Sequence, residues 1–219
     1  MLKFKNLTIL GTSHIAKESV QAVERLITQK KPNLIALELD LARYRAIVTQ
    51  KKQYHKNLDI KTFIINLIGA YAEKSLGKQT GIKPGTEMRT AIDLAKQNKI
   101  PLFLIDQPIN ITLRKLSSQI TRKEKITLVK DVFTTIFNKK KKIPFDLNKV
   151  PSKKIINSLI QETKEKYPSI YKILVEERNV YMAKALNKII NKFPEKEILA
   201  IVGAGHENDI VGELKSITK

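Results

Sequence analysis

The chain has 219 residues, a formal net charge of +20 and no cysteine. This length suits one domain with a sizeable insertion, and the lack of cysteine excludes disulfides and thiolate metal sites. The longest apolar stretch, residues 63–72, is far shorter than the roughly 20 residues that a membrane-spanning helix needs. The N-terminal residues do not resemble a secretory signal. We therefore expect a soluble, cytoplasmic protein without a membrane span.

The positive charge does not by itself indicate a nucleic-acid-binding protein. A pI near 10 is typical of such proteins. However, 34 of the 41 basic residues are lysines, and they are scattered along the chain without a known nucleic-acid-binding motif. We therefore expect no dedicated nucleic-acid partner, and binding of nucleic acid stays the least favoured of three functions considered below.

The first half of the chain alternates predicted strands and helices. Short apolar runs without clean alternation predict strands that are buried on both faces, as in a parallel sheet. Apolar residues at helical spacing predict the helices. In chain order these are a strand at 7–10, a helix at 17–29, a strand at 34–39, helices at 61–76 and 87–97, and a strand at 101–105.

The interval 109–193 contains helical patterns and no convincing strand. Its predicted helices are 109–116, 122–138, 153–165 and 170–192, and a strand at 198–202 and a last helix follow. The order predicts a single α/β domain over residues 1–219. It has a mostly parallel central sheet flanked by helices, with a large helical insertion at about 109–193 before the last strand. The apolar surface of helices 61–72 and 170–190 predicts a homodimer, because large apolar patches usually mark an interface.

Two predicted strands end in matching turns. Gly11-Thr12-Ser13-His14 follows the first strand, and Gly203-Ala204-Gly205-His206 follows the last. Glycine lets the chain turn sharply and approach a ligand closely. Each histidine then begins a helix, where free backbone amides attract anions. The third histidine, His55, lies in a polar run and is expected at the surface.

The other two predicted strands end in carboxylates, Glu38 and Asp106. Ligands of open parallel sheets bind beyond the carboxyl ends of the strands, so both carboxylates are expected at one sheet edge with His14 and His206. No nucleotide cofactor is expected. The dinucleotide-binding pattern would need glycine where Asn208 stands, and the chain has no phosphate-binding loop of the Walker type.

Six blocks in order resemble the TraB/PrgY family, particularly its archaeal members. They are Gly11 to Val20, Leu37 to Leu39 with Arg43 to Ala46, Pro84 to Met88 with Ala91 and Ile92, Leu104 to Asp106 with Ile111 to Arg114, Glu176 to Arg178 with Tyr181 to Ala183, and Val202 to His206. Two departures from the family pattern, at Gln107 and Asn179, put charge pairs near the site in doubt.

The resemblance implies a fold shared with Tiki proteins, which are metal-dependent peptidases. It also implies a relation to pheromone-shutdown proteins, which reduce release of a signalling peptide. By this resemblance the chain is expected to be a metal-dependent peptide hydrolase. Many family members carry C-terminal membrane helices, and this chain resembles the soluble domain alone.

The expected site combines a divalent metal ion of unknown identity with strand-end residues. His14, His206 and Glu38 are the candidate ligands, and Glu87 or Asp106 is the candidate base or supports the ligands. Without a metal, one histidine could serve as the general base. Candidate substrate-binding residues are Gly11, Thr12, Arg43, Arg45, Arg114, Glu177, Arg178, Gly203 and Gly205.

The sequence also allows two other interpretations of these residues. The arginines are as well explained by structural ion pairs, in which Glu177 and Arg178 anchor the helical insertion to the sheet. The same pocket could also bind a peptide or a small anion without catalysis. Arginine grips carboxylate or phosphate with two bonds, which lysine cannot do, so a peptide or small anionic substrate fits both functions.

Overall fold

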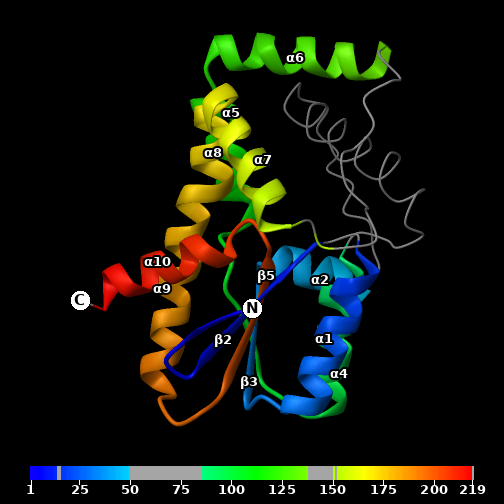
Figure 1. Cartoon of the computed structure of the whole chain (residues 1–219), viewed down its shortest axis with the longest axis vertical. Helices are drawn as coiled ribbons and strands as arrows, with labels where there is room; N and C mark the ends of the chain where they lie inside the picture. The colour runs from blue at the N-terminus through cyan, green and yellow to red at the C-terminus, as the bar shows by residue number, and fades with distance from the viewer. Residues whose placement is uncertain (14–15, 50–84, 138–149, 151, 219) are drawn as a thin grey trace.

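The computed structural model describes residues 1–13, 16–49, 85–137, 150 and 152–218. A central sheet lies between two layers of helices, and a group of further helices stands above one sheet edge (Figure 1). The predicted helix at 61–76, His14, His55 and half of the apolar surface behind the dimer prediction lie outside the described residues. None of the described helices is long and apolar enough to cross a membrane.

The sheet has the order β1-β2-β5-β3-β4, and only the outer pair β1 and β2 is antiparallel. The four predicted strands are confirmed, and the three-residue β1 adds a short edge hairpin. The first and last predicted strands, β2 and β5, are parallel neighbours, with Gly11 opposite Val202 and Thr12 opposite Gly203. The strands are β1 (Leu2–Phe4), β2 (Leu7–Thr12), β3 (Leu34–Leu37), β4 (Leu102–Leu104) and β5 (Ile198–Gly203).

Helices cover both faces of the sheet, which explains the continuous apolar runs of β3, β4 and β5. The helices α1 and α4 pack on one face, where Leu37 and Ile201 meet Met88 and Ile92. The helices α9 and α10 cover the other face around Met182. These helices are α1 (Lys17–Lys30), α2 (Leu41–Thr49), α4 (Thr86–Gln97), α9 (Glu177–Lys192) and α10 (Glu207–Ile217).

The described residues of the predicted insertion form helices and their connections, and none of them is in a strand. Its α7 lies over the turn after β5, since a Cβ on Gly205 would meet Ile160 Cδ1 at 3.6 Å. The predicted helix at 170–192 is interrupted, because a π-helical turn, η1, precedes α9. The elements are α5 (Ile109–Gln119), α6 (Arg122–Phe137), α7 (Lys153–Lys166), α8 (Pro168–Tyr171) and η1 (Lys172–Glu176).

The inner face of α9 is buried in the protein's own core. Leu186 and Met182 are fully buried, and Ile190 is 3% exposed. Much of the apolar surface predicted at 170–190 is therefore covered within one chain. The predicted homodimer stays a prediction, which now depends on surfaces other than this face.

Candidate functional site

The carboxyl ends of the parallel strands lie at one edge of the sheet, as the sequence predicts, and the helical insertion stands over this edge (Figure 1). The backbone amide of Glu38 donates to Ile201 O at 3.1 Å, so residue 38 lies beside the end of β5. The amide of Asp106 donates to Leu39 O at 3.2 Å, beside the end of β3. Glu38 and Asp106 are 5% and 4% exposed. Two buried carboxylates therefore share one edge of the sheet. Each negative charge needs an opposite charge or hydrogen-bond donors that offset the cost of its burial.

Arg178 of α9 provides that compensation. Its Nε donates to Asp106 Oδ1 at 3.0 Å and its Nη2 to Asp106 Oδ2 at 2.6 Å, which is a two-pronged grip. The same Nη2 donates to Glu38 Oε1 in a short ion pair. Its Nη1 donates to Leu174 O at 3.0 Å. One guanidinium thus ties the helical insertion to two strand ends, which is the anchoring role considered for Arg178 in the sequence.

A second arginine extends the cluster on the side of α2. Arg43 Nη2 donates to Asp106 Oδ2 at 2.6 Å, and its Nε donates to Asp40 Oδ2 at 3.1 Å. Asp40 also accepts from the amide of Ile109 at 2.7 Å, where α5 begins. Asp40 therefore ties the start of the insertion to the end of β3.

The charges of the cluster hold both carboxylates ionised. Burial alone would raise the pKa of Glu38, but His206 when protonated, Arg178 and the Gly203 amide outweigh it and lower this pKa. The amide of Gly203 donates to Glu38 Oε2 at 2.6 Å. Burial would likewise raise the pKa of Asp106, and Arg178 and Arg43 together lower it. Both oxygens of Glu38 and both oxygens of Asp106 already accept hydrogen bonds.

His206 lies at this cluster with one ring nitrogen fixed. Its Nδ1 is 2.6 Å from Asn179 Oδ1. The Asn179 amide is oriented by its other end, because Nδ2 donates to Asp209 Oδ2 at 3.1 Å. An amide oxygen can only accept, so Nδ1 carries the proton and Nε2 carries the lone pair. That lone pair faces Arg178 Nη1 at 3.3 Å and Glu38 Oε1 at 3.5 Å.

The environment favours the neutral form of this imidazole. Burial, with Arg178 as a further cause, lowers the pKa of His206 against the opposing effect of Glu38. The side chain is 12% exposed, so solvent still reaches it. A neutral, oriented imidazole, whose Nε2 lone pair meets only the long contact from Arg178 Nη1 among the described residues, can accept a proton at neutral pH.

The two matching turns leave neighbouring strands, as expected. The amide of Ala204 donates to Thr12 O at 2.8 Å, and Thr12 Oγ1 donates to Val202 O at 3.1 Å. A Cβ on Gly11 would meet the Cα of Ala204 at 3.0 Å, a tight contact with backbone, so glycine suits this close approach. His14 lies outside the described residues, so the pairing of His14 with His206 stays a prediction.

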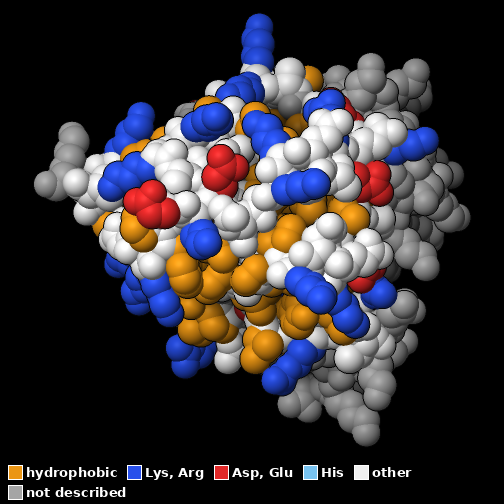
Figure 2. Space-filling model, turned by 90° about the horizontal axis from the view of Figure 1, so that it is seen from below, with side chains coloured by type: hydrophobic (Ala, Val, Ile, Leu, Met, Phe, Trp, Pro, Cys, Tyr) orange, Lys and Arg blue, Asp and Glu red, His pale blue; other side chains and the backbone are white. Residues whose placement is uncertain are grey.

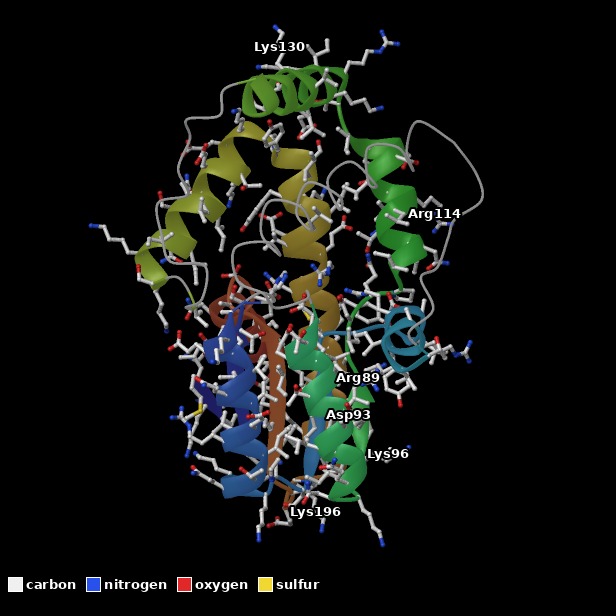
Figure 3. All side chains as sticks on the ribbon, turned by 90° about the vertical axis from the view of Figure 1, so that its right-hand side faces the viewer. Arg89, Asp93, Lys96, Arg114, Lys130 and Lys196 are labelled. Atoms are coloured by element: carbon white, nitrogen blue, oxygen red, sulfur yellow. The ribbon has the colours of Figure 1, made fainter. Side chains whose placement is uncertain are left out.

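The other predicted site residues lie at the surface or in other contacts of the fold. Glu87 is 1% exposed in the first turn of α4. Glu177 accepts from Lys115 Nζ at 2.7 Å, which joins α9 to α5. Arg45 on α2 and Arg114 on α5 are exposed, and Arg114 is labelled in Figure 3 on a helix of the insertion. Among the described residues, neither of these two arginines joins the cluster around Arg178.

The predicted metal ligands fit only in part. His206 Nε2 carries the lone pair that a metal ligand needs, with Arg178 Nη1 at 3.3 Å from it, and its other nitrogen is held in the way typical of metal-bound histidine. Glu38 does not fit while Arg178 and the Gly203 amide occupy its oxygens. No group of three or more histidine, aspartate or glutamate side chains within the described residues is arranged to hold a metal ion. A metal centre would therefore depend on His14 and on release of Glu38 by Arg178.

The hydrogen bonds of Asn179, Asp40 and Asp209 at this edge were not predicted from the sequence. Asn179 stood out only as a departure from the family pattern, yet it is 2% exposed and orients His206. Asp40 directly follows a predicted strand, and this position beside Glu38 was a usable signal. Asp209 lies one helical turn after His206, which gave no signal on its own.

Comparison with known proteins agrees with the resemblance seen in the sequence. The sequence model of the TraB/PrgY/gumN family matches residues 3–216. An uncharacterized protein of Methanocaldococcus jannaschii is 35% identical over 97% of this chain and 54% of its own length. TraB domain-containing proteins of Bos taurus and Homo sapiens are 20% identical over 90% of this chain and over 59% and 60% of their own lengths. This chain thus spans little more than half the length of these relatives, and it belongs to the TraB/PrgY/gumN family.

Proposed function

We propose that the carboxyl edge of the sheet is the active site of a hydrolase that cleaves peptide bonds, with His206 as the proton acceptor. The observation that carries this proposal is the orientation of His206. Its Nδ1 is held by Asn179, and its Nε2 lone pair faces the charge cluster at 3.3 Å from Arg178. Peptides are proposed as the substrate class from the family resemblance, since the site itself supports proton transfer and not one particular bond.

In this proposal Nε2 removes a proton from the attacking water. The proton adds to the ring as the water oxygen bonds to the carbonyl carbon, and Glu38 Oε1 at 3.5 Å stabilises the imidazolium that forms. The imidazolium then gives this proton to the amine nitrogen that leaves as the C–N bond breaks. Asn179 keeps the ring in place while the charge changes. Protonation of Nε2 ends its contact with Arg178 Nη1, whose other hydrogen donates to Leu174 O. The N–H that is freed in this way then donates to the carbonyl oxygen of the substrate as negative charge develops there. Arg178 is hydrogen-bonded to two carboxylates, so its positive charge is held in place. The site therefore needs no large reorganisation during the reaction.

The divalent metal predicted from the sequence remains part of the proposal only through His14 and His206. The described residues do not complete its ligand set, so the mechanism above uses side chains alone. Measurement of bound metal in the purified protein, with and without His14→Ala, tests this part separately. Metal that stays bound in both His14→Ala and His206→Ala proteins would contradict the shared centre.

The activity is tested with a mixture of quenched fluorescent peptides, before and after treatment with a chelator. We expect turnover that falls by about 100-fold or more in His206→Ala, since a general base typically contributes 10²–10⁴-fold. Asn179→Asp places a negative charge beside Nδ1, so it should raise the pKa of His206. The acidic limb of the pH–rate profile should then shift to higher pH, while the fold stays intact by thermal melting.

A binding protein without catalysis is the second candidate. It is favoured by one observation, namely that all the hydrogen-bonding atoms of both strand-end carboxylates are already engaged. Peptide binding without turnover, weakened equally by Arg178→Met and by His206→Ala, would support this candidate. A wild-type protein that cleaves no peptide under any metal condition would rule out the hydrolase.

A further inference from the structure

The end of the molecule opposite this site carries an apolar patch surrounded by lysines. Figure 2 views the protein from this end and shows apolar side chains gathered at the surface with Lys and Arg side chains around them. It is the end at which the parallel strands begin and at which α1, α4 and α9 finish (Figure 1). We call it the strand-start face.

Partly exposed aromatic rings contribute to the strand-start face. Phe4, Phe103 and Phe193 pack against the core from its rim. The rings of Phe103 and Phe193 are in contact, with centroids 5.8 Å apart and planes tilted by 58°. Asn6 Nδ2 donates to Phe193 O at 2.9 Å and to Lys196 O at 2.8 Å, which fixes two of the turns to each other. The face is therefore built on two turns that are hydrogen-bonded to each other.

Three lysines of this face have an unusual backbone. Lys5, Lys31 and Lys99 have φ angles of 51°, 44° and 55°, and they are the non-glycine residues with positive φ among the described residues. Glycine or asparagine adopts this conformation at lower cost. Lysine makes up 34 of the 219 residues. If the cost of a positive φ were the same for every side chain, all three positions would be lysine by chance in roughly one case in 270.

Helix capping accounts for only part of this pattern. A lysine after a helix interacts favourably with the helix dipole, which applies to Lys31 after α1 and to Lys99 shortly after α4. Lys5 follows a strand and gains nothing from a helix. Its Nζ lies 5.7 Å from the centre of the Phe4 ring, as Lys192 Nζ lies 5.5 Å from that of Phe193. Lysine and aromatic side chains therefore lie against each other at two places on this face.

We propose that the strand-start face docks on a lipid bilayer that contains anionic headgroups. Charge complementarity identifies this occupant. Five exposed lysines accompany the apolar patch, against two exposed glutamates in the turn before β5. They are Lys5, Lys31, Lys99, Lys192, Lys196, Glu195 and Glu197. Lysines attract anionic headgroups while apolar side chains enter the interface. A single-stranded nucleic acid would need flat ring faces for base stacking, whereas Phe103 and Phe193 pack on each other and on the core. Duplex DNA needs only the lysines, and the apolar patch beside them favours a lipid surface over it.

Docking in this way would leave the proposed site open. The site lies at the carboxyl ends of the strands and this face at their starts, so His206 lies at the end of the sheet opposite the lipid surface. The proposal is independent of the hydrolase, because it uses none of the residues around Arg178. It also gives a role to part of the positive charge that no motif in the sequence explained.

The test is co-sedimentation of the full chain with vesicles of phosphatidylcholine alone or with about 30% phosphatidylglycerol, at a salt concentration of about 150 mM. The first variant replaces Lys5, Lys31 and Lys99 by asparagine, which tolerates a positive φ. The matched control replaces Lys123, Lys125 and Lys130 of α6 by glutamine and removes the same charge. Figure 3 shows Lys130 and Lys196 at opposite ends of the molecule.

We expect the wild type to bind the anionic vesicles and not the neutral ones. A lysine near an anionic surface contributes a factor of roughly five, so the asparagine variant should bind about 100-fold more weakly, while the α6 control changes less than threefold. A second variant, Lys192→Gln with Lys196→Gln, avoids positions of positive φ and should lose about 25-fold. Thermal melts of all variants show whether they fold.

Three outcomes would overturn the proposal. One is an equal loss in the α6 control, because binding would then reflect net charge and not this face. Another is no difference between anionic and neutral vesicles, including no binding to either. The third is tighter binding of duplex DNA or of polyglutamate than of anionic vesicles at the same salt concentration. That result would identify a nucleic acid or an acidic protein as the partner.

Discussion

Replacing Arg178 by methionine should destabilise the protein strongly and in a way that depends on pH. Methionine keeps the apolar stem of the side chain and removes the guanidinium. The change deprives Asp106 of two hydrogen bonds and Glu38 of its ion pair. Asp106 keeps Arg43, and Glu38 keeps the Gly203 amide. Breaking a buried ion pair on one side typically costs about 3–5 kcal/mol, and we expect a loss of this size at pH 7.

The pH dependence of this loss distinguishes charge from packing. In the wild type the pKa values of Glu38 and Asp106 are lowered. Their stabilising contribution is therefore present above the pKa of the unfolded chain, about 4, and disappears as the pH falls through the lower folded values. Without Arg178, burial raises both pKa values. As the pH falls to about 4–5, the carboxylates of the variant take up protons, and the free-energy cost of their buried charges disappears. The difference between the two proteins should therefore shrink from pH 7 to pH 4.5.

Urea unfolding at both pH values measures these free energies. Arg114→Met is the matched control, because Arg114 is exposed on α5, and it should change the free energy of unfolding by less than about 0.5 kcal/mol. Adding Glu38→Gln and Asp106→Asn to Arg178→Met removes the uncompensated charges and should restore part of the loss. A loss below about 1 kcal/mol, or a loss that is the same at both pH values, would refute this account of the cluster.

Two further predictions concern the turns and the insertion. Glu124 accepts from Thr121 and from the Ser169 amide, which lowers its pKa to about 2. Glu124→Gln should cost about 2–3 kcal/mol at pH 7, and the cost should vanish in unfolding measurements as the pH falls from 4.5 toward 2. Gly11→Ala should lower the melting temperature by several degrees, at about 2–4 °C per kcal/mol, because its Cβ would meet backbone at 3.0 Å. Gly205→Ala, with its nearest contact at 3.6 Å, should change little, and equal melting temperatures for both alanine variants would contradict this reasoning.

Much of the fold follows from local patterns in the sequence. The four buried strands were predictable because an apolar run without alternation suits a strand covered on both faces, as β5 is. The short β1 was not among them, because three residues give too little pattern. The π-helical turn η1 was also not predicted. A single π turn adds one residue, while the apolar residues after it still recur at helical spacing, so the pattern of 170–192 still indicated one helix.

The site was predictable only as far as topology determines it. Parallel strands place their carboxyl ends at one edge, which brings Glu38, Asp106 and the turn before His206 together without knowledge of any side-chain contact. The partners of these groups come from the insertion, about 70 residues away from Asp106 in the case of Arg178. Nothing in a single sequence states how such an insertion folds back. Asn179 therefore looked like a lost charge, although its amide holds His206.

The contacts of Arg178 also explain why the site and the insertion depend on each other. The guanidinium belongs to α9 and its carboxylates belong to the sheet, so the insertion packs against the sheet edge only when the charges meet. Arg43 and Asp40 repeat the connection at the start of α5. A buried, fully paired cluster adds little net stability compared with an apolar one. Its value lies in holding the helix that carries Asn179 at hydrogen-bonding distance from His206, which links the order of the insertion to the chemistry proposed at the sheet edge.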